Sequence, residues 1–428
     1  MNPLTLAIVA ILFLALLETP LFTVIAALSI ACLYLVSHDW LALQTILIEM
    51  NRLGSMPVLV ALPLFTFVGC LLTETRSPQR IMNFIDALLG WLPGGLAMAA
   101  LCACAFFTAL TGASGVTIVA LGSILYPVMR KKGYGDEFTL GLLTTSGSLG
   151  LLFPPSLPVI LYGVVAQVDI GKIFKAALVP GLLLIGVLCI YAFFKQASSG
   201  RRRKVTTVGI SVQRVKSTFF EAIWDWPLIG IILSGVYGGF VTIAEVSAVV
   251  LIYVVLVECF VLKEISFFST LPSIIVESAV LSGAIIVILG VALGFTGFLV
   301  DQQIPYRILE WLTALTDSKL LFLGGLNLFL LVVGCIMDIF SAIVIVVPIM
   351  VPIALSYGVD PIHLCVIFLV NLEIGYSTPP VGINLFISSL KFEKPVTMVY
   401  RASLPYLLIL LALLIVITYF PWLSLFMV

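Results

Sequence analysis

Two glycine- and hydroxyl-bearing interruptions fall inside membrane-length apolar stretches in the first half of this chain. Residues 111–115 read Thr-Gly-Ala-Ser-Gly, and residues 147–156 contain the pair Pro154-Pro155. Proline cannot complete helical hydrogen bonding and its ring clashes with the preceding turn, so these segments predict breaks between short helices. Hydroxyl and freed carbonyl oxygens suit a hard cation such as Na⁺, and helix N-termini suit an anionic group. The chemistry indicated is therefore ion binding at membrane depth.

The second half of the chain repeats this pattern at an offset of 225 residues. Pro379-Pro380 corresponds to the first proline pair, and the same offset links three further positions: Pro127 with Pro352, Gly133 with Gly358, and Gly150 with Gly375. Paired interruptions in the two halves of a membrane protein point to a transporter binding site near the bilayer midplane. The alternative is that proline and glycine merely kink packed membrane helices.

Three polar side chains beside the predicted breaks have two interpretations each. Asp338 lies within an apolar stretch, where an ionisable residue is costly and usually functional, so it is a candidate cation ligand; it is also a good helix cap. Glu373 either bonds backbone or contacts substrate, and Asn384 either reaches a substrate or packs beside the break. Glu245 is more consistent with a helix cap or brace. His363, in contrast, is predicted to lie in an outer loop, as is His38.

Composition places the chain in the membrane. Hydrophobic residues make up 62% of 428 positions and charged residues 10%, which excludes an ordinary soluble domain. The net charge of zero gives no reason to expect nucleic acid as a partner. The eight cysteines are scattered through apolar segments, so we expect no metal other than Na⁺ and no cofactor. No phosphate-binding loop, HExxH motif or nucleophile elbow is present, so we expect neither an enzyme nor an ATP-driven pump.

The predicted fold is an all-α polytopic membrane protein with about 11 spans plus two re-entrant helical hairpins. We expect a surface helix at 265–280 and a separate span at 281–300. The predicted organisation is scaffold spans in 1–75, a first transport repeat in 76–166 (hairpin 94–129, broken span 138–166), scaffold spans and surface helices in 167–300, a second transport repeat in 301–390 (hairpin 320–356, broken span 362–389) and a final span in 391–428.

Lysine and arginine set the predicted orientation, because they accumulate in short cytoplasmic loops. Basic residues flank the first hairpin on both sides, so both of its ends are expected in the cytoplasm. Counting spans from there puts most of the 21 basic residues inside, including the run Arg201–Lys204. The second hairpin then enters from the outer face, which makes the two halves an inverted repeat. Both termini are expected on the outer, periplasmic side.

Several stretches together resemble the large membrane subunit of the tripartite ATP-independent periplasmic (TRAP) transporters. They are Phe106–Thr117, Gly147–Ser156 with Tyr162-Gly163, Gly238–Glu245, Gly358–His363 and Gly375–Phe386. The resemblance implies a multi-pass importer of the bacterial inner membrane that works by an elevator mechanism with Na⁺ as the coupling ion. It also implies a periplasmic substrate-binding protein that delivers an organic anion, and a small four-span membrane subunit. Because the chain begins where large subunits begin, that subunit is expected to be a separate chain.

The resemblance also implies which residues form the sites. The first Na⁺ site is carried over to Thr111, Ser114, Gly150, Phe153 and Pro155. The second is carried over to Asp338, Ser341, Gly375, Thr378 and Val381. Substrate contacts are expected from Ser114, Thr117, Ser156, Ser377, Thr378 and Asn384. The chain departs from the family pattern at Ile243-Ala244 and at Phe340, where proline or small residues are common.

The resulting hypothesis is Na⁺-symport of an organic anion, of the C4-dicarboxylate, sugar acid, sialic acid or sulfonate class. The alternative is a self-sufficient secondary anion carrier or ion antiporter that needs no binding protein. Such carriers usually show Ser-Asn-Thr at their breaks, and this chain has none there. A scaffold protein would gain nothing from paired midplane breaks. An intramembrane enzyme would need Asp338 and Glu373 to act as a catalytic pair.

Overall fold

The computed structural model describes residues 21–37, 44–198, 211–239 and 241–428, and within these ranges the chain is helical and has no strand. The N-terminal half comprises α2 (Leu21–Ser37), α3 (Gln44–Gly54), the 3₁₀ turn η2 (Pro57–Val60), α4 (Ala61–Thr73), α5 (Ser77–Leu89), α6 (Gly95–Thr111), α7 (Ser114–Lys131), α8 (Asp136–Ser146), α9 (Leu157–Ala166) and α10 (Ile170–Ser198). The remainder comprises α11 (Val212–Glu221), α12 (Trp226–Gly238), α13 (Ile243–Leu256), the π-helix η3 (Val257–Val261), α14 (Thr270–Asp301), α15 (Ile304–Leu315), α16 (Lys319–Ile336), α17 (Ile339–Ser356), α18 (Pro361–Gly375), α19 (Ile383–Lys391), α20 (Val396–Tyr419) and α21 (Trp422–Leu425).

Long apolar helices dominate the described part of the chain. Six are long and apolar enough to cross a membrane, or up to eight if two bent helix pairs each count as one span. Many large apolar side chains on these helices point outward, such as Ile252, Val276 and Leu328, each at least 60% exposed. Outward apolar surface of this kind suits a lipid environment. The polytopic class agrees with the sequence, whereas the number of 11 spans stays a prediction. Residues 1–20 of the predicted scaffold region 1–75 lie outside the described residues.

Helix boundaries reproduce the 225-residue repeat. The second helices of the two hairpins, α7 and α17, begin at Ser114 and Ile339, and the next helices, α8 and α18, begin at Asp136 and Pro361. The predicted breaks are all present: residues 112–113 and 337–338 at the hairpin tips, and residues 147–156 and 376–382 in the broken spans. The unit α6–α9 thus recurs as α16–α19.

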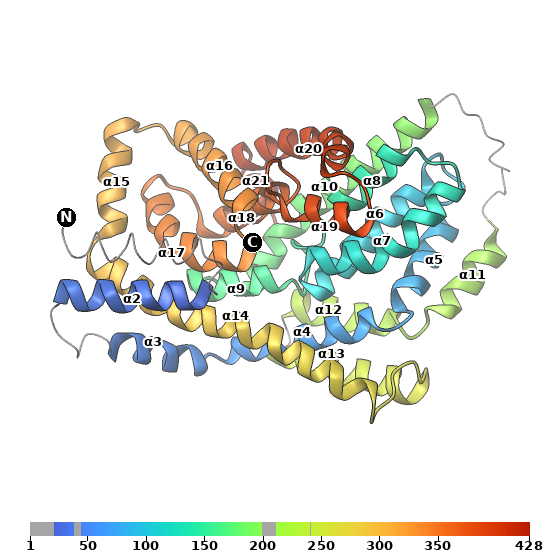
Figure 1. The fold of residues 1–428 in the computed structure, drawn as a ribbon, viewed down its shortest axis with the longest axis horizontal. Coiled ribbons are helices and arrows are strands. Elements are labelled where there is room, and N and C mark those ends of the chain that lie inside the picture. The colour runs from blue at the N-terminus through green and yellow to red at the C-terminus, as the bar shows by residue number, and fades with distance from the viewer. Residues whose placement is uncertain (1–20, 38–43, 199–210, 240) are drawn as a thin grey trace.

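The two repeats are interlocked. Helix α7 of the first repeat packs against α19 of the second, and α17 of the second packs against α9 of the first (Figure 1). In each repeat, the second helix of the hairpin therefore packs against the second helix of the broken span in the other repeat. This exchange brings both sets of breaks into one central region, although they lie far apart in sequence.

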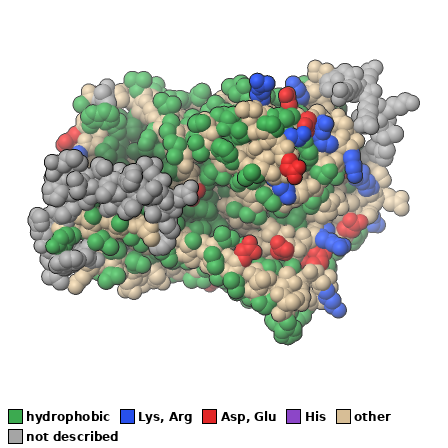
Figure 2. Space-filling view, in the orientation of Figure 1, with side chains coloured by type: hydrophobic (Ala, Val, Ile, Leu, Met, Phe, Trp, Pro, Cys, Tyr) green, Lys and Arg blue, Asp and Glu red, His purple; other side chains and the backbone are tan. Residues whose placement is uncertain are grey.

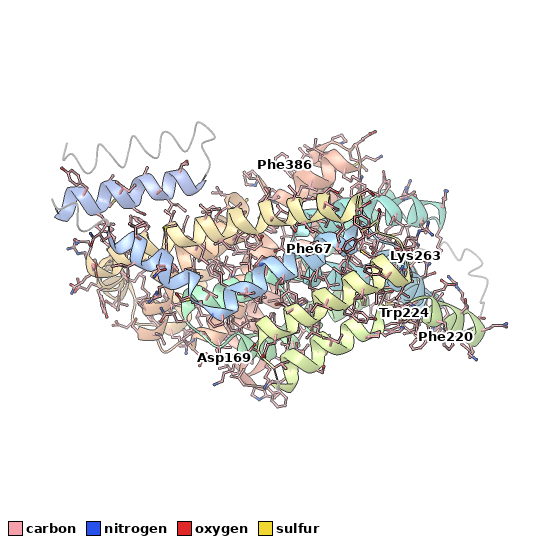
Figure 3. The ribbon with its side chains drawn as sticks, turned by 90° about the horizontal axis from the view of Figure 1, so that it is seen from below. Phe67, Asp169, Phe220, Trp224, Lys263 and Phe386 are labelled. Atoms are coloured by element: carbon pink, nitrogen blue, oxygen red, sulfur yellow. The ribbon has the colours of Figure 1, made fainter. Side chains whose placement is uncertain are left out.

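A separate group of helices lies beside the repeats. The 32-residue α14 runs along α2, α3 and α4, and α13 packs on α4 and α12 (Figures 1 and 3). The predicted division into a surface helix at 265–280 and a span at 281–300 is wrong, because α14 is continuous through this region. Its serines lie within the helix, because the Ser278 and Ser282 hydroxyls donate to the Ile275 and Ser278 carbonyl oxygens of the preceding turn.

Charged side chains gather mainly at one end of the face seen in Figure 2, where α5 and α11 lie. Aromatic side chains accompany them: Phe220 and Trp224 lie near this end (Figure 3), and both are more than 40% exposed. Aromatic rings next to charges are typical of the membrane–water interface. This end is therefore suited to a bilayer surface.

Three further expectations concern single positions. His363 is not in an outer loop but inside α18, 2% exposed, with its Nε2 atom 3.2 Å from the Thr418 carbonyl oxygen. His38 and the basic run Arg201–Lys204 lie outside the described residues. Glu245 forms a capping box with Thr242 at the start of α13, which confirms the cap interpretation.

Candidate functional site

The first hairpin tip is a glycine turn between two helices. Helix α6 ends at Thr111, and Gly112 follows with a positive φ of 65°, a conformation that glycine adopts without strain. Helix α7 then begins at Ser114, whose hydroxyl donates to the Asn384 side-chain oxygen at 2.8 Å. That bond joins the tip of the first repeat to the start of α19 in the second repeat.

The first break, residues 147–156, is held against the first hairpin by a buried hydroxyl. The Thr108 side-chain oxygen lies 2.8 Å from both the Gly147 carbonyl oxygen and the Thr117 hydroxyl. Gly150 touches α6 so closely that a Cβ atom there would lie 2.0 Å from the Ala105 carbonyl oxygen. Nearly the whole break is buried, so its backbone groups depend on protein partners and not on water.

The second hairpin tip carries a charge. Asp338 caps α17: its Oδ1 atom accepts from the backbone N–H groups of Phe340 and Ser341, both at 3.0 Å, and its Oδ2 atom accepts from the Ser341 hydroxyl. The cap role is thus observed, and the carboxylate is held in one orientation at the tip.

The second break, residues 376–382, packs against this tip and is hydrogen-bonded to it. The Ile339 N–H donates to the Tyr376 hydroxyl oxygen, and the Cys335 thiol donates to the Thr378 carbonyl oxygen at 3.2 Å. Gly375 lies directly against Gly334, since a Cβ on Gly375 would be 2.6 Å from the Gly334 carbonyl carbon. Beyond Thr378 the break reaches the surface, where Pro379, Pro380 and Val381 are exposed.

The structure brings some of the predicted site residues together and separates others. Ser114 meets Asn384, and Thr117 is linked to the first break through the Thr108 hydroxyl. Asp338 and Ser341 lie together at the second tip. Gly375 packs against Gly334 and the Thr378 carbonyl oxygen accepts from the Cys335 thiol, so both residues lie near this tip. Phe153 instead packs its ring on Gly181 of α10, and Val381 is 43% exposed on the surface. The remaining residues, Thr111, Gly150, Pro155, Ser156 and Ser377, are buried in the tip or breaks.

Several buried polar atoms on the broken spans have no hydrogen-bond partner. Within the described ranges they are Thr145 Oγ1, Ser156 Oγ, His363 Nδ1, Asn371 Oδ1, both carboxyl oxygens of Glu373, Ser377 Oγ and Asn384 Nδ2. Buried polar groups are normally satisfied, so these atoms are candidates for contact with a bound ion, substrate or water. The described residues hold no group of three His, Cys, Asp or Glu that could bind a metal, so a cation at the breaks would be bound mainly by hydroxyl and carbonyl oxygens.

Three residues at the site were missed by the sequence reasoning. Thr108 lies one turn before the predicted tip and Thr145 one turn before the predicted break, so a search of neighbouring turns for hydroxyls would have included both. Tyr376 was quoted within its motif, but its hydroxyl contact with the opposite tip depends on tertiary packing. No local signal could have revealed it.

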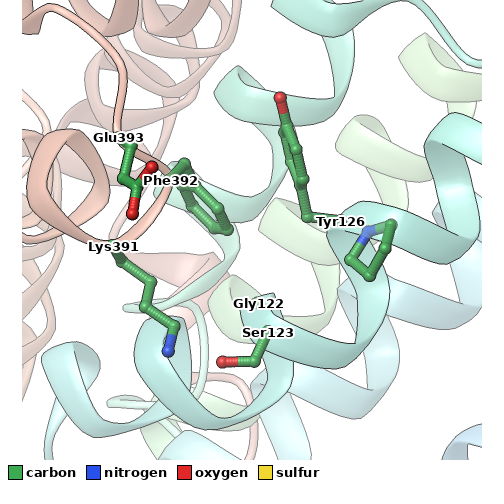
Figure 4. A pocket seen from close by; sticks show the side chains of 7 residues that line it. Gly122, Ser123, Tyr126, Lys391, Phe392 and Glu393 are labelled. Carbon is green, nitrogen blue, oxygen red and sulfur yellow. The ribbon is translucent and has the colours of Figure 1, made fainter.

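A cavity opens at the far end of the contact between α7 and α19. Two glycines on α7 allow the close approach of the helices: a Cβ on Gly115 would be 2.6 Å from the Ile387 side chain, and one on Gly122 would be 2.7 Å from the Phe392 ring. The cavity measures about 300 Å³ (Figure 4). Its lining residues are Gly122, Ser123, Tyr126, Pro127, Lys391, Phe392 and Glu393. The interface between α7 and α19 thus extends from the Ser114–Asn384 hydrogen bond to this cavity, whose lining includes Lys391.

Comparisons with known proteins agree with this arrangement. The family model described as "Tripartite ATP-independent periplasmic transporter, DctM component" matches residues 8–423. The C4-dicarboxylate TRAP transporter large permease protein DctM of Pseudomonas aeruginosa is 37% identical over 90% of this chain and 89% of that protein. The isethionate TRAP transporter permease protein DctMQ of Oleidesulfovibrio alaskensis is 35% identical over 89% of this chain, but the match spans only 59% of that protein. The solved YdaH transporter of Alcanivorax borkumensis shares the fold, with a TM-score of 0.62 at 14% identity over 88% of this chain and 87% of that one.

Proposed function

This chain belongs to the family of DctM components, the large permease subunits of TRAP transporters, and we propose that it imports a small organic anion by Na⁺ symport. The observation that carries the proposal is the meeting of the two repeats at their breaks, where buried hydroxyls and amide groups lack partners. A substrate site needs such groups, because an empty site leaves polar atoms that the ligand later satisfies.

The Na⁺ sites are proposed at the two tips. At the first tip, the region of Thr111, Ser114 and the buried first break offers hydroxyl and carbonyl oxygens without any formal charge. At the second tip, Asp338 supplies a carboxylate beside Ser341 and the segment from Gly375 to Thr378. Oxygen ligands of this kind suit hard cations, and discontinuous helices commonly provide them in secondary transporters.

The organic anion is proposed to bind between the N-termini of α7 and α19. Ser114 and Asn384 lie at these two N-termini, and the amide nitrogen of Asn384 is a buried donor without a partner. Helix N-termini carry partial positive charge, which suits a carboxylate or a sulfonate. The proposed classes are C4-dicarboxylates, sugar acids, sialic acids and sulfonates; relatives named for a C4-dicarboxylate and for isethionate support an acidic substrate.

Transport is proposed to follow an elevator mechanism in the inner membrane. The interlocked repeats α6–α9 and α16–α19 would move as one body, and the group containing α2–α4, α13 and α14 would form the scaffold. A small membrane subunit would extend the scaffold, and a periplasmic binding protein would deliver the substrate. Both termini of the chain are proposed to face the periplasm.

Uptake into proteoliposomes tests the function. The vesicles contain this chain with its presumed small subunit, and receive the binding protein and a panel of organic acids with or without an inward Na⁺ gradient. We expect uptake that requires both Na⁺ and the binding protein. Uptake by this chain alone would instead identify a self-sufficient carrier, and uptake indifferent to Na⁺ would exclude symport with this ion.

Substitution of Ser114 tests the site. The variant Ser114→Leu places a bulky apolar group against Asn384, so we expect it to insert normally and to lose uptake. The matched control is Ser234→Leu on α12, where the serine is exposed and bonds only within its own helix. Normal uptake by Ser114→Leu would contradict the site assignment.

A further inference from the structure

Arg80 connects the helix that leads into the first repeat with the separate group of helices beside it. It lies on α5, and its guanidinium donates to three carboxyl groups. They are Asp225 before α12, at 2.8 and 3.3 Å, Glu258 in η3, at 3.0 Å, and Glu264 after η3, at 2.7 Å. We call these four residues the Arg80 cluster. Asp225 is 3% exposed and Glu258 2% exposed, so the cluster is largely enclosed in protein.

The local fold brings two of these acids together. The π-helix η3 follows α13 directly, and the Glu258 carbonyl oxygen accepts from the N–H groups of Glu264 and Ile265, at 2.9 and 3.3 Å. This turn places the Glu264 side chain beside Glu258, and its second carboxyl oxygen accepts from the Arg76 N–H at 2.6 Å. Single π-turns that interrupt helices frequently occur at functional sites. The backbone therefore delivers two acids to one arginine at the start of α5.

The Arg80 cluster has an excess of negative side chains. One guanidinium serves three carboxyl groups. Arg76 and Lys263 lie close in sequence, but both are exposed and neither forms an ion pair with a described residue. The Oε1 atom of Glu258 accepts from Arg80, whereas its Oε2 atom is buried and has no hydrogen-bond partner in the described ranges. Leaving a buried charge without a partner is strongly unfavourable, so this oxygen requires a positive ligand.

A proton fits this position better than a metal ion does. The described residues contain no group of three His, Cys, Asp or Glu side chains arranged to hold a metal. A proton needs only one oxygen. On Glu258 Oε2 it forms an O–H bond and removes one negative charge, and Oε1 continues to accept from Arg80. Glu264 is 20% exposed and gives the cluster an edge at the solvent, from which the proton can come.

We propose that the Arg80 cluster binds one proton on Glu258 and that this proton holds the joint between α4 and α5 closed. Loss of the proton to water leaves a bare buried charge, which loosens the contacts of Arg80 with η3 and with the turn after it. The groups that face Glu258 are Arg80 on α5, Asp225 before α12, Tyr253 on α13, and Cys259 and Glu264 along η3 and the following turn. The Tyr253 hydroxyl is occupied, because it donates to the Trp224 carbonyl oxygen.

The joint consists of residues 74–76, between the end of α4 at Thr73 and the start of α5 at Ser77. Helix α5 packs against α6, the first helix of the first hairpin, so a change at this joint reaches the first repeat. Movement of that repeat about the joint rests on the proposed function, whereas proton binding by the Arg80 cluster does not.

Infrared spectroscopy of the purified full chain tests proton binding without any transport assay. We expect a carboxylic acid band at low pH that converts to a carboxylate band as the pH rises. It should be absent from Glu258→Gln and retained in the control Glu221→Gln, where the glutamate is exposed on α11. If no band is lost in Glu258→Gln, or if the band that is lost does not change with pH in the unaltered protein, the proposal is wrong.

A second variant tests whether the cluster holds the proton. Glu264→Gln removes a neighbouring negative charge and leaves Glu258 in place, so the conversion of the Glu258 band should shift to lower pH. A conversion at the same pH as in the unaltered protein would show that Glu258 does not share its charge with the cluster. If Glu258→Gln fails to fold, this shift identifies the band.

Hydrogen–deuterium exchange of the full chain measures the joint, which includes the Arg76 N–H. Rates for residues 74–80 are divided by those of an unstructured peptide at the same pH. An opening linked to the loss of one proton increases up to about tenfold per pH unit over the range in which the band converts. We expect this increase in the unaltered protein, its shift to lower pH in Glu264→Gln, and its loss in Glu258→Gln, which mimics the neutral acid. Exchange that does not follow the band would contradict the link between the proton and the joint.

Discussion

The two broken spans begin at equivalent positions, Asp136 and Pro361, but satisfy their broken backbone differently. The first break is buried almost throughout and is held by the Thr108 hydroxyl, with no formal charge. The second break is clasped to a tip that Asp338 caps with a carboxylate, and it is exposed from Pro379 to Val381. Backbone groups away from water need internal partners, whereas exposed ones can use solvent. The comparison indicates a fixed first break and a more responsive second one.

The largest expected effect comes from adding a methyl group to the first break. In Gly150→Ala the new Cβ would lie 2.0 Å from the Ala105 carbonyl oxygen and 2.5 Å from the Ala109 nitrogen, so backbone must move. We expect a loss of more than about 4 kcal/mol in the free energy of unfolding. The equivalent Gly375→Ala should also destabilise, but less, because its closest contact is 2.6 Å.

Heating followed by size-exclusion chromatography in detergent measures these losses. The control is Gly186→Ala on α10, where a Cβ meets nothing within 4 Å and the change should be neutral or stabilise by up to about 1 kcal/mol. A greater loss of unfolding free energy for Gly375→Ala than for Gly150→Ala would contradict the interpretation that the first break is the more rigid of the two.

Removal of the charged cap should give the next largest effect. Asp338→Ala takes away the acceptor for two backbone N–H groups, which costs about 0.5–2 kcal/mol of stability. We also expect the Na⁺ concentration for half-maximal uptake to rise, because the variant lacks the proposed ligand. Asp360→Ala is a matched control, since Asp360 caps α18 by accepting from the Ile362 N–H. The same Na⁺ dependence in both variants would remove Asp338 from the cation site.

A smaller effect is expected when the uncharged network of the first break loses one hydroxyl. Thr108→Val leaves the Gly147 carbonyl and the Thr117 hydroxyl with fewer partners, so we expect a loss of about 0.5–1.5 kcal/mol in the free energy of unfolding. Thr313→Val is the control, because that exposed hydroxyl bonds only within α15. Thermal unfolding of both variants measures the difference, and equal stabilities would mean that the network does not fix the break.

The smallest effect concerns an ion pair that joins the first repeat to the turn that follows the second repeat. Asp136 lies 3.2 Å from the Lys394 ammonium group and 3.5 Å from Arg130 Nε. Burial acts to raise the pKa of Asp136, but hydrogen bonds from Tyr126 and Lys394 outweigh it and, with the nearby positive charges, hold the pKa below its usual range. A lowered pKa stabilises the folded protein at neutral pH, and this stability is lost as the pH falls below about 4.

Melting temperatures measured between neutral pH and about pH 3 check this contribution. The melting temperature of Asp136→Asn should fall less steeply with decreasing pH than that of the unaltered protein. The control Asp301→Asn, at an exposed position, should fall as steeply as the unaltered protein. The effect is small because the pair is partly exposed and therefore screened. An unchanged slope for Asp136→Asn would show that this contact does not couple the repeats.

Much of this architecture could be predicted from local sequence. Three of the four breaks follow from proline and glycine chemistry, whereas the second tip, which has neither residue, follows from the 225-residue offset and from Asp338. The Asp338 and Glu245 caps follow from side chains that bond their own backbone. The predicted division between 265–280 and 281–300 was wrong, because Ser278 and Ser282 are polar residues whose hydroxyls bond within one continuous helix. The prediction that His363 lies in an outer loop was wrong. A single polar residue can lie inside a buried helix when another helix offers it a hydrogen-bond partner, as the Thr418 carbonyl oxygen does here.

The sequence by itself determined the membrane class, the duplicated unit and the positions of its breaks, because apolar length and helix interruption depend on neighbouring residues. Tertiary structure alone decided that α7 packs on α19 and α17 on α9, that Ser114 meets Asn384, and that one break is buried while its counterpart is exposed. These helix contacts join residues more than about 170 positions apart. Local pattern leaves such contacts undetermined, since the same apolar face can pack against many surfaces.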